Sequence, residues 1–587
     1  MLTRLGYTSV LAQLKSATRL GPSESTDNMN ELRAFLPQTN IAYFTMEVAL
    51  RAEVHTYSGG LGVLAGDTVR SCADLELPIV FISLLSRAGY FRQEIDSEGR
   101  QIEHPDPWDT ERWAKPLAAM IGVKIENRDV WVRPWLYVHT SDLGFSVPVL
   151  LLDTDIEQND SRDRNLTHHL YGGDEVYRLK QELLLGVGGS RVLEALSFNI
   201  GTYHLNEGHA AFATIELLKR FPRRRRQTDI TEWSFDADRV RHLCVFTTHT
   251  PVEAGHDRFS YELVERVCTD LMPTEALKVF GGADRLNMTR LALNLSGYVN
   301  GVAQRHAVTA REMFPGFDVR AVTNGVHVCT WAHPAFAELF QTHYPQWQHE
   351  PEVLARADTL PDDELWAAHE KAKADLCTMV RQKTGVELDP KLPIIGFARR
   401  MTGYKRPDLL FSDLARLASI AEKYPFQLVF SGKAHPADAA GKQSLQAIHK
   451  AMGTLAGRLP VAFLTNYDMD IAKVLIAGAD VWLNTPLPPL EASGTSGMKA
   501  AVNGLLNLSM LDGWWVEGCI EGVTGWSITD HSDASPLYDK LENVVLPLYY
   551  NDRGRWTWMM KQAISKLACY FNTHRMMRRY AAEAYLR

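Results

Sequence analysis

Short apolar segments recur along the whole chain, and each is bounded by turn residues and followed by a stretch with helical periodicity. The segments are continuously apolar and do not alternate with polar residues, which is typical of strands buried on both faces. Parallel sheets covered by helices provide such burial, and the alternation of strand and helix favours doubly wound α/β units. We therefore predict strands at 41–44, 78–83, 147–152, 243–247, 393–397, 426–430, 460–464, 480–483 and 505–508.

The length of 587 residues is too great for one hydrophobic core. We predict two Rossmann-like α/β domains, residues 1–323 and 324–555, that face each other across a central cleft, where ligands of such folds usually bind. The terminal segment 556–587 has helical faces rich in Arg and Met. We expect this segment to pack back on the first domain.

The composition excludes several classes of protein. A net charge of −8 does not predict a nucleic-acid surface, and the basic run Arg223–Arg226 is interpreted as a solvated loop. Because no apolar run reaches the roughly 18 residues that a membrane span requires, and the first residues lack a signal-peptide pattern, we expect no membrane association. Seven scattered cysteines argue against a disulfide framework or a zinc site, so a cytoplasmic location is expected.

A lysine closes the Gly/Ser/Thr-rich segment Glu491-Ala-Ser-Gly-Thr-Ser-Gly-Met-Lys499, where an apolar helical stretch begins. Backbone N–H groups at such a turn bind anions. A buried lysine there can lose its proton and condense with an aldehyde. Pyridoxal 5′-phosphate carries both an aldehyde and a phosphate, so the segment predicts this cofactor on Lys499. The alternative is a strand-to-helix turn with a solvated lysine.

Two further segments have the character of anion sites. The glycine-rich turn Tyr57–Asp67 opens a helix, so that its backbone N–H groups can bind an anion, although a simple tight turn is the alternative. In the segment 397–407, which follows a predicted strand, four cations lie at Arg399, Arg400, Lys405 and Arg406. Cations so close repel each other unless an anion or carboxylates compensate them, and a solvated charge run is the alternative.

Several histidines follow apolar runs and were weighed as metal ligands. None has the His-Glu-x-x-His spacing of a helical zinc site, and hydrogen-bonded structural histidines are the alternative, so we predict no metal. The histidines concerned are His204, His209, His249, His256 and His327.

Taken together, the ordered motifs from about residue 41 to 515 resemble those of the α-glucan (glycogen, starch and maltodextrin) phosphorylases, most closely the short prokaryotic type. The segments Tyr177–Glu182, Asn300–Ala303 and Leu511–Trp515 belong to the same series. The resemblance implies a two-domain GT-B glycosyltransferase fold. It also implies reversible phosphorolysis of α-1,4-glucan or maltodextrin by inorganic phosphate, giving α-D-glucose 1-phosphate with retained configuration, and a possible homodimer.

The resemblance also implies roles for individual positions. Lys499, Arg400, Lys405, Glu491 and His249 would serve catalysis. Lys499, Arg399, Thr495, Tyr467, Trp331 and Gly60 would bind the cofactor, although Trp331 and Tyr467 are open to a second interpretation as core aromatics. Gly59, Gly60, Leu61, Asn324, Ser493 and Gly494 would bind substrate.

The chain departs from the family pattern at three places. Thr402 and Gly403 replace a His-Glu pair of the mammalian type, and Arg399 stands where the family has lysine. Only about forty residues precede the first predicted strand, so the regulatory extension of the mammalian type is not expected and allosteric control is not implied. The acceptor-side loop at about 152–170 is short, which leaves the preferred glucan length open. The favoured direction, effectors and subunit number are also open at this point.

Two rival functions remain at this point. A retaining glucosyltransferase that uses a nucleotide sugar shares the architecture, but a second glutamate stands eight residues after the first in many such enzymes, where this chain has Lys499. A non-catalytic glucan-binding homologue is the other alternative. The presence of Arg400, Lys405 and Glu491 argues against a decayed site.

Overall fold

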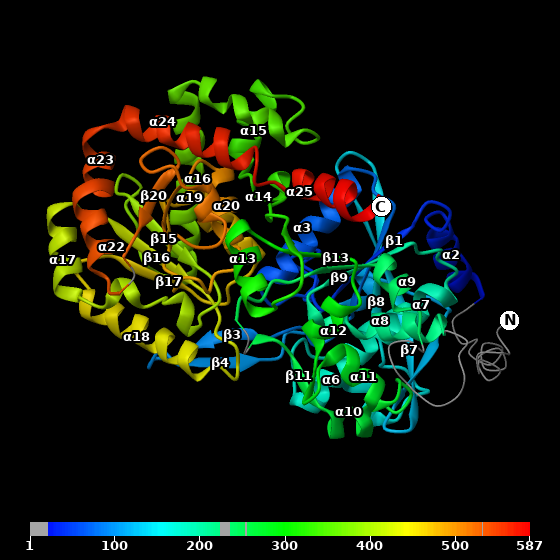
Figure 1. Cartoon of the computed structure of the whole chain (residues 1–587). Coiled ribbons are helices and arrows are strands. Elements are labelled where there is room, and N and C mark those ends of the chain that lie inside the picture. The colour runs from blue at the N-terminus through cyan, green and yellow to red at the C-terminus, as the bar shows by residue number, and fades with distance from the viewer. Residues whose placement is uncertain (1–21, 223–234, 253–254, 531, 587) are drawn as a thin grey trace.

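All nine predicted segments form strands in the computed structural model, which describes residues 22–222, 235–252, 255–530 and 532–586 (Figure 1). The strands belong to two large, mostly parallel sheets with helices packed on them. The predicted α/β class is therefore confirmed. The run Arg223–Arg226 lies outside the described residues.

The first sheet has ten strands, and its central part is parallel, in the order β14-β13-β10-β9-β1-β2-β8. Antiparallel strands complete the edge beyond β8. The strands are β1 Ile41–Thr45, β2 Ile79–Leu84, β5 Lys115–Pro116, β6 Ile121–Ile125, β7 Arg128–Thr140, β8 Ser146–Asp153, β9 Thr202–Asn206, β10 Cys244–Thr247, β13 Tyr298–Gly301 and β14 Val319–Ala321.

Helices and two small antiparallel pairs of strands accompany this sheet. The helices are α2 Pro22–Arg33, α3 Gly60–Asp74, α4 Thr110–Trp113, α5 Ser161–Arg164, α6 Glu175–Leu183, α7 Gly189–Ala195, α8 Phe212–Arg220, α9 Ala237–Leu243, α10 Tyr261–Val267, α11 Thr274–Gly281, α12 Met288–Asn294 and α13 Gln304–Met313. The antiparallel pairs are β3 Arg92–Ile95 with β4 Gln101–His104, and β11 Arg258–Ser260 with β12 Arg285–Asn287.

The second sheet has six strands, all parallel, in the order β17-β16-β15-β18-β19-β20. Its strands are β15 Ile394–Ala398, β16 Gln427–Ser431, β17 Val461–Leu464, β18 Val481–Asn484, β19 Leu506–Met510 and β20 Gly525–Ile528. The helices around it are α14 Val328–Trp331, α15 Pro334–His343, α16 Asp362–Thr384, α17 Leu414–Lys423, α18 Ala439–Leu455, α19 Met469–Gly478, α20 Thr495–Val502, α21 Trp515–Gly518, α22 Ser535–Lys540, α23 Leu546–Asn551 and α24 Arg553–Ala563.

The apolar runs are buried because both faces of each sheet are covered. In the first sheet, Phe44 and Ile82 belong to one core, whereas Tyr43 and Phe81 belong to the core on the opposite face. Adjacent residues of a strand point to opposite faces, so a strand covered on both sides must be apolar throughout. This explains why continuous apolar runs identified the parallel strands.

The hairpin β3–β4 extends from the first sheet to the second (Figure 1). The Gln93 backbone N–H donates to Oδ1 of Asn466 at 2.9 Å, and its side-chain amide donates to the Gly432 carbonyl at 2.9 Å. Gln101 donates to the Ala434 carbonyl at 2.9 Å. These bonds reach loops at the carboxyl ends of β16 and β17, so the hairpin fixes one sheet relative to the other.

The chain ends beside the first sheet, where α25 (Thr573–Tyr580) lies against α3 (Figure 1). Met576, Met577 and Tyr580 are buried in the core that contains Tyr43 and Phe81. A parallel backbone bridge joins Asn572 to Val326. The terminal segment therefore contacts both α3 and the segment that leads into α14. The domain boundaries at 323 and 555 stay a prediction.

In the described part of the chain, every helix is too short or too polar to cross a bilayer.

We predict that Gly325→Ala destabilises the protein by about 1–3 kcal/mol, because overpacking at a tight contact forces the backbone to shift. A Cβ on Gly325 would lie 2.2 Å from the backbone carbonyl atoms of Asn572. Gly453→Ala is the matched control, since its Cβ meets nothing within 4 Å in the exposed face of α18; that change should stabilise by about 0.5–1 kcal/mol. Denaturant unfolding measures both, and equal effects would contradict the predicted role of the Gly325–Asn572 contact.

Candidate active site

The carboxyl ends of the two parallel sheets meet at a set of direct contacts. The turn after β1 touches the segments after β15 and β17: the Met469 N–H donates to the Tyr57 hydroxyl at 3.1 Å. Nη2 of Arg400 lies 3.1 Å from the position of a Cβ on Gly59. Ligands of α/β folds bind at the carboxyl ends of strands. A ligand site is therefore expected at this junction.

Lys499 is a buried residue in the second turn of α20. The helix begins after Gly494, whose φ of +87° suits glycine. Lys499 is only 7% exposed, and its Nζ lies 3.9 Å from the centroid of the Trp331 ring. Burial lowers the pKa of the Lys499 amine to about 8, because the charged form loses hydration. The alternative of a solvated lysine is therefore wrong.

A cluster of ion pairs surrounds the carboxylate of Glu491, which follows β18. Nη2 of Arg399 donates to Oε2 at 2.6 Å, and Nζ of Lys405 lies 3.0 Å from Oε1 and 2.9 Å from Oε2. Burial alone would raise the pKa of the Glu491 carboxyl, but the two cations outweigh it and hold the pKa below its usual value. One carboxylate thus compensates part of the predicted charge repulsion.

Several hydrogen-bond donors in and beside this cluster have no partner among the described residues. Arg399 is 8% exposed, yet its Nε and Nη1 have no hydrogen-bond partner within the described residues. The hydroxyl of Ser493, two residues after Glu491, is also buried without a partner. Unpaired buried donors are costly unless a ligand or water satisfies them. An oxyanion beside Arg399 would satisfy both guanidinium nitrogens.

Arg400 and the glycine-rich turn face each other. Arg400 is exposed, and no hydrogen bond or ion pair of its guanidinium occurs in the described part of the chain. Opposite it, Gly60 and Leu61 occupy the first two positions of α3, where the N–H groups have no acceptor inside the helix. The Arg400 guanidinium and these amides can therefore act on one anion.

The shape of this turn depends on Glu47, which follows β1 and is 1% exposed. Its Oε2 accepts the N–H groups of Ser58 at 2.6 Å and Gly59 at 3.1 Å, and its Oε1 accepts the Tyr171 hydroxyl at 3.1 Å. The Gly59 amide is thus committed to Glu47. The amides of Gly60 and Leu61 remain as the donors of the turn.

The predicted sugar-binding residues lie around the junction, but the structure joins them to the cation cluster only in part. The backbone N–H of His249 donates to Glu207 at 2.7 Å, and its Nε2 lies 2.6 Å from Oδ1 of Asn206. Burial lowers the pKa of His249 to about 3, so this ring is neutral at pH 7. Oδ1 of Asn324 is buried without a partner among the described residues.

The loop 491–494 is held in place by hydrogen bonds to the segment 511–515. The Glu491 N–H donates to Oδ2 of Asp512 at 2.8 Å, and the Trp514 N–H donates to the Ser493 carbonyl at 2.9 Å. Gly494, whose Cβ would lie 3.3 Å from the Trp514 ring, follows directly. Burial raises the pKa of Asp512 to about 6. The segment 511–515 thus positions the loop that carries Glu491.

The remaining predicted cofactor residues lie in helices and a loop around the second sheet. Thr495 is the first residue of α20. Tyr467 follows β17 and is half-buried, and burial raises the pKa of its hydroxyl. Trp331 is 1% exposed at the end of α14. Trp331 is therefore both a core aromatic and the neighbour of Lys499.

Four of the five candidate metal-ligating histidines have hydrogen-bond partners of their own, and His209 lies beside a carboxylate. His204 contacts the Thr247 hydroxyl at 2.8 Å and the Tyr585 hydroxyl at 2.7 Å, and His256 contacts the Thr289 hydroxyl at 2.8 Å. His209 lies 3.6 Å from a carboxylate oxygen of Asp257. The structural interpretation of His204 and His256 is therefore the better one.

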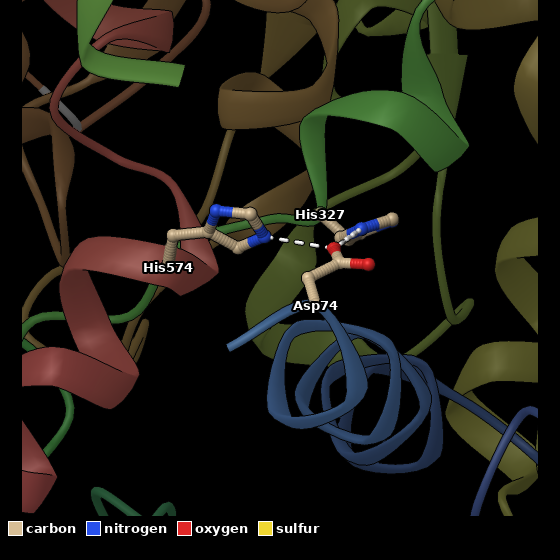
Figure 2. A group of neighbouring side chains, drawn as sticks. All are labelled: Asp74, His327 and His574. Carbon is tan, nitrogen blue, oxygen red and sulfur yellow. Dashed lines mark hydrogen bonds and ion pairs between the residues drawn. The ribbon is translucent and has the colours of Figure 1, made fainter. Parts of the chain in front are cut away.

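Figure 2 shows that His327 instead joins Asp74 and His574. Nε2 of His327 and Nε2 of His574 lie 2.7 and 2.8 Å from the same oxygen of Asp74. Among the described residues, this is the one group of three potential metal ligands whose ligand atoms all lie within 4.8 Å of one another. Nδ1 of His574 faces the His349 carbonyl at 3.2 Å. Both nitrogens of His574 thus face acceptors, and the group clamps α25 to α3 through hydrogen bonds.

Sequence reasoning missed Glu47, Asp67, Asp74 and His574 as parts of this region. Asp67 and Asp74 lie one heptad apart on α3, where they face the segment 327–331. Residues seven apart share one face of a helix. Two acids on the same face of an apolar helix were the sequence signal that could have identified Asp67 and Asp74. His574 is 247 positions from His327, so no local spacing could have paired them.

Comparison with known proteins shows similarity to one family. A model of the carbohydrate phosphorylase family matches residues 256–523. A maltodextrin phosphorylase of Thermococcus litoralis is 39% identical over 597 residues, which cover 93% of this chain and 70% of that protein. Glycogen phosphorylases of Mycobacterium bovis and Aquifex aeolicus are 36% and 33% identical, and each alignment covers 93% of this chain, with 71% and 86% of the respective relative.

We predict that Glu491→Gln binds inorganic phosphate about tenfold more tightly than the unchanged protein, equivalent to about 1.4 kcal/mol. The reason is that the carboxylate competes with any anion for Arg399 and Lys405. Calorimetry measures the affinity. Glu103→Gln, which removes a carboxylate paired with Lys442 at 2.7 Å, is the control and should leave the affinity unchanged. Weaker phosphate binding by Glu491→Gln would contradict the competition.

Proposed function

Because the chain belongs to the carbohydrate phosphorylase family, we propose that it catalyses reversible phosphorolysis of α-1,4-glucan and releases α-D-glucose 1-phosphate with retained configuration. Maltodextrin or glycogen is the glucan, in line with the names of its relatives. The observation that carries the proposal is the buried amine of Lys499 in α20, eight residues after Glu491 of the Arg399–Lys405–Glu491 cluster. The fold is that of a GT-B glycosyltransferase.

The residues fit pyridoxal 5′-phosphate. Lys499 is a buried amine with a lowered pKa, which suits condensation with an aldehyde. Trp331 and Tyr467 offer aromatic surface for a pyridine ring, and the orphaned nitrogens of Arg399, with Thr495 and the start of α20, suit a phosphate. When bound, the cofactor would supply a phosphate group that exchanges a proton with the substrate phosphate.

Inorganic phosphate would be held by Arg400, Lys405 and the backbone amide of Gly60. The cations of Arg399, Arg400 and Lys405 outnumber the carboxylates of Glu491 and Glu47, which leaves an excess of positive charge at this junction. That excess offsets the repulsion between two phosphates held close together. Lys405 would turn from Glu491 to the incoming phosphate, which frees the carboxylate for a sugar hydroxyl.

The glucosyl unit would be oriented by Glu491, Ser493, Gly494, Asn324 and the backbone of His249. The buried oxygens of Ser493 and Asn324 have unused hydrogen-bonding capacity within the described residues, and hydroxyls of a sugar can satisfy it. Since the amide of His249 is already bonded to Glu207, its carbonyl is the group left for the substrate. Fixed orientation raises the rate by avoiding misaligned encounters.

The acid of the reaction is the substrate phosphate itself. It would give its proton to the departing glycosidic oxygen and then attack the anomeric carbon from the same face, which retains configuration. A glycosidase would instead need two carboxyl groups that flank the bond. Glu491 is bound by two cations, which favours its ionised form and makes it a poor acid.

We place the enzyme in the cytoplasm, because all seven cysteines are free and disulfides are rare in reducing compartments. Glucan, inorganic phosphate and glucose 1-phosphate are its proposed partners, and a homodimer is expected from the family. No nucleic-acid or membrane partner is proposed.

The direct test is an assay of the purified protein with maltodextrin and inorganic phosphate. We expect phosphate-dependent formation of α-D-glucose 1-phosphate. Release of a nucleoside diphosphate from a nucleotide sugar, without product from phosphate, would identify the rival glucosyltransferase. If neither reaction is observed, the result would favour a non-catalytic glucan-binding protein.

We predict that Arg400→Ala lowers phosphorolysis at least about a hundredfold, because a lost charge-assisted contact to the reacting phosphate costs about 3 kcal/mol. The cofactor content should stay unchanged, as judged from the absorbance of the purified variant. Arg416→Ala, which removes a partly exposed arginine paired with Asp539, is the matched control and should keep full activity. Normal phosphorolysis by Arg400→Ala would refute the assigned role.

A further inference from the structure

Asp67 is a buried carboxylate in α3 for which the proposed reaction gives no role. It is 1% exposed. Its Oδ2 accepts the indole N–H of Trp331 at 2.7 Å and the backbone N–H of His327 at 3.2 Å. Two donors from the segment 327–331 thus converge on one oxygen. A carboxylate that accepts an indole N–H fixes the plane of the ring.

The plane of Trp331 matters because the ring lies against Lys499. Nζ of Lys499 is 3.9 Å from the ring centroid, a distance at which an ammonium is attracted by the π face. The chain Asp67–Trp331–Lys499 therefore runs from a helix of the first sheet to the predicted cofactor lysine. Asp67 touches the lysine only through the indole, so its effect on position is indirect.

Charge adds a second connection. Burial lowers the pKa of the Lys499 amine, the carboxylate of Asp67 opposes that effect, and the guanidinium of Arg70, also on α3, adds to it. Oδ1 of Asp67 lies 3.5 Å from Nη1 of Arg70, and neither atom has a hydrogen bond within the described part of the chain. The negative charge of Asp67 is therefore shared between Arg70 and the lysine.

We propose that Asp67 is a positioning residue that holds the Trp331 ring against Lys499 and supplies a counter-charge near this amine. The inference rests on the proposed function, in which Lys499 carries the cofactor. Asp67 does not touch the reacting atoms, so it is not a catalytic residue.

The helix that carries Asp67 also makes this positioning relevant to phosphate. α3 begins at Gly60, the proposed phosphate amide, and Asp67 follows seven residues later. At about 1.5 Å per residue, the two positions are about 10 Å apart along one rigid helix. Asp67 and the Gly60 amide thus move as one body, which sets the lysine and the substrate phosphate in a fixed relation.

The reaction that Asp67 should affect is the attachment of an aldehyde to the Lys499 amine. The neutral amine of Lys499 adds to the aldehyde carbon of pyridoxal 5′-phosphate; the carbonyl oxygen then leaves as water and a carbon–nitrogen double bond forms. Only the unprotonated amine can add. The rate therefore rises with pH until the amine is fully neutral, and its midpoint reports the proton affinity of Lys499.

The test measures this midpoint in the full-length protein. Bound aldehyde is removed with hydroxylamine and dialysis, pyridoxal 5′-phosphate is added over a series of pH values, and the rate is followed by absorbance. Borohydride reduction and peptide mass spectrometry locate the adduct on Lys499. Asp67→Asn keeps an oxygen for the Trp331 and His327 donors but loses the charge. We expect its midpoint to fall by about one pH unit, since a nearby opposite charge shifts a pKa by about that amount or more.

Three further variants separate charge from folding. Asp67→Glu keeps the charge and should keep the midpoint of the unchanged protein. Arg70→Met removes the opposing cation and should raise the midpoint, a change of opposite sign that tests the proposal even if Asp67→Asn fails to fold. Asp74→Asn removes the other buried carboxylate of α3, which contacts His327 and His574 but not Trp331; it should lower stability without moving the midpoint.

The outcomes distinguish this inference from the function on which it rests. If the unchanged protein forms no adduct on Lys499, the proposed function itself fails. If the adduct forms with the same pH midpoint in the unchanged protein, in Asp67→Asn and in Arg70→Met, the proposed function stands and the role of Asp67 is refuted. An equal shift in Asp74→Asn and Asp67→Asn would also overturn it, because a merely structural effect would then explain both.

Discussion

The amine of Lys499 is enclosed by protein, with the face of an indole 3.9 Å away and no hydrogen bond in the described part of the chain. Burying a charged amine is costly, so the amine is stable there only if it loses its proton readily or gains a partner. That constraint explains the lowered pKa near 8. It also explains why a phosphorylase of this kind would hold an aldehyde cofactor at this point, since a neutral amine is the reactive form.

The rest of the site compensates charge around this amine. Glu491 links Arg399 to Lys405, Glu47 shapes the turn opposite Arg400, and Asp67 faces Lys499 through Trp331. Each carboxylate lies just beyond the end of a parallel strand or on α3. The doubly wound fold thus supplies both the cations for two phosphates and the buried acids that compensate the charge of these cations when no phosphate is bound.

Much of this arrangement followed from the sequence because its signals are local. Continuous apolar runs such as 394–398 can be buried only between two layers of helix, and the glycine at 494 marks the start of α20. Strand β9 was missed because it carries two polar residues that are buried through partners elsewhere in the chain. His204 contacts the hydroxyls of Thr247 and Tyr585, and Asn206 donates to the hydroxyl of Thr45. The alternating strand β7 was missed because it pairs antiparallel and its pattern differs from the buried runs.

In the site, too, residues with local signals could be predicted, and residues that depend on distant contacts could not. The residues 491–499 and 399–405 could be found from local spacing, because each group follows one strand. The acids that position them could not, since Glu47, Asp67 and Asp74 contact residues more than a hundred positions away. Hydrogen bonds of that range are set by the packing of α3 and α25 against the segment 322–331, which no periodicity in one segment reveals.

A crystal structure of the protein grown with pyridoxal 5′-phosphate and inorganic phosphate tests the central claim most directly. The account predicts density that continues from Nζ of Lys499 into a ring beside Trp331 and Tyr467, with a second phosphate between Arg400 and the amide of Gly60. Density that ends at the Lys499 amine, with the cofactor bound elsewhere on the protein, would contradict it.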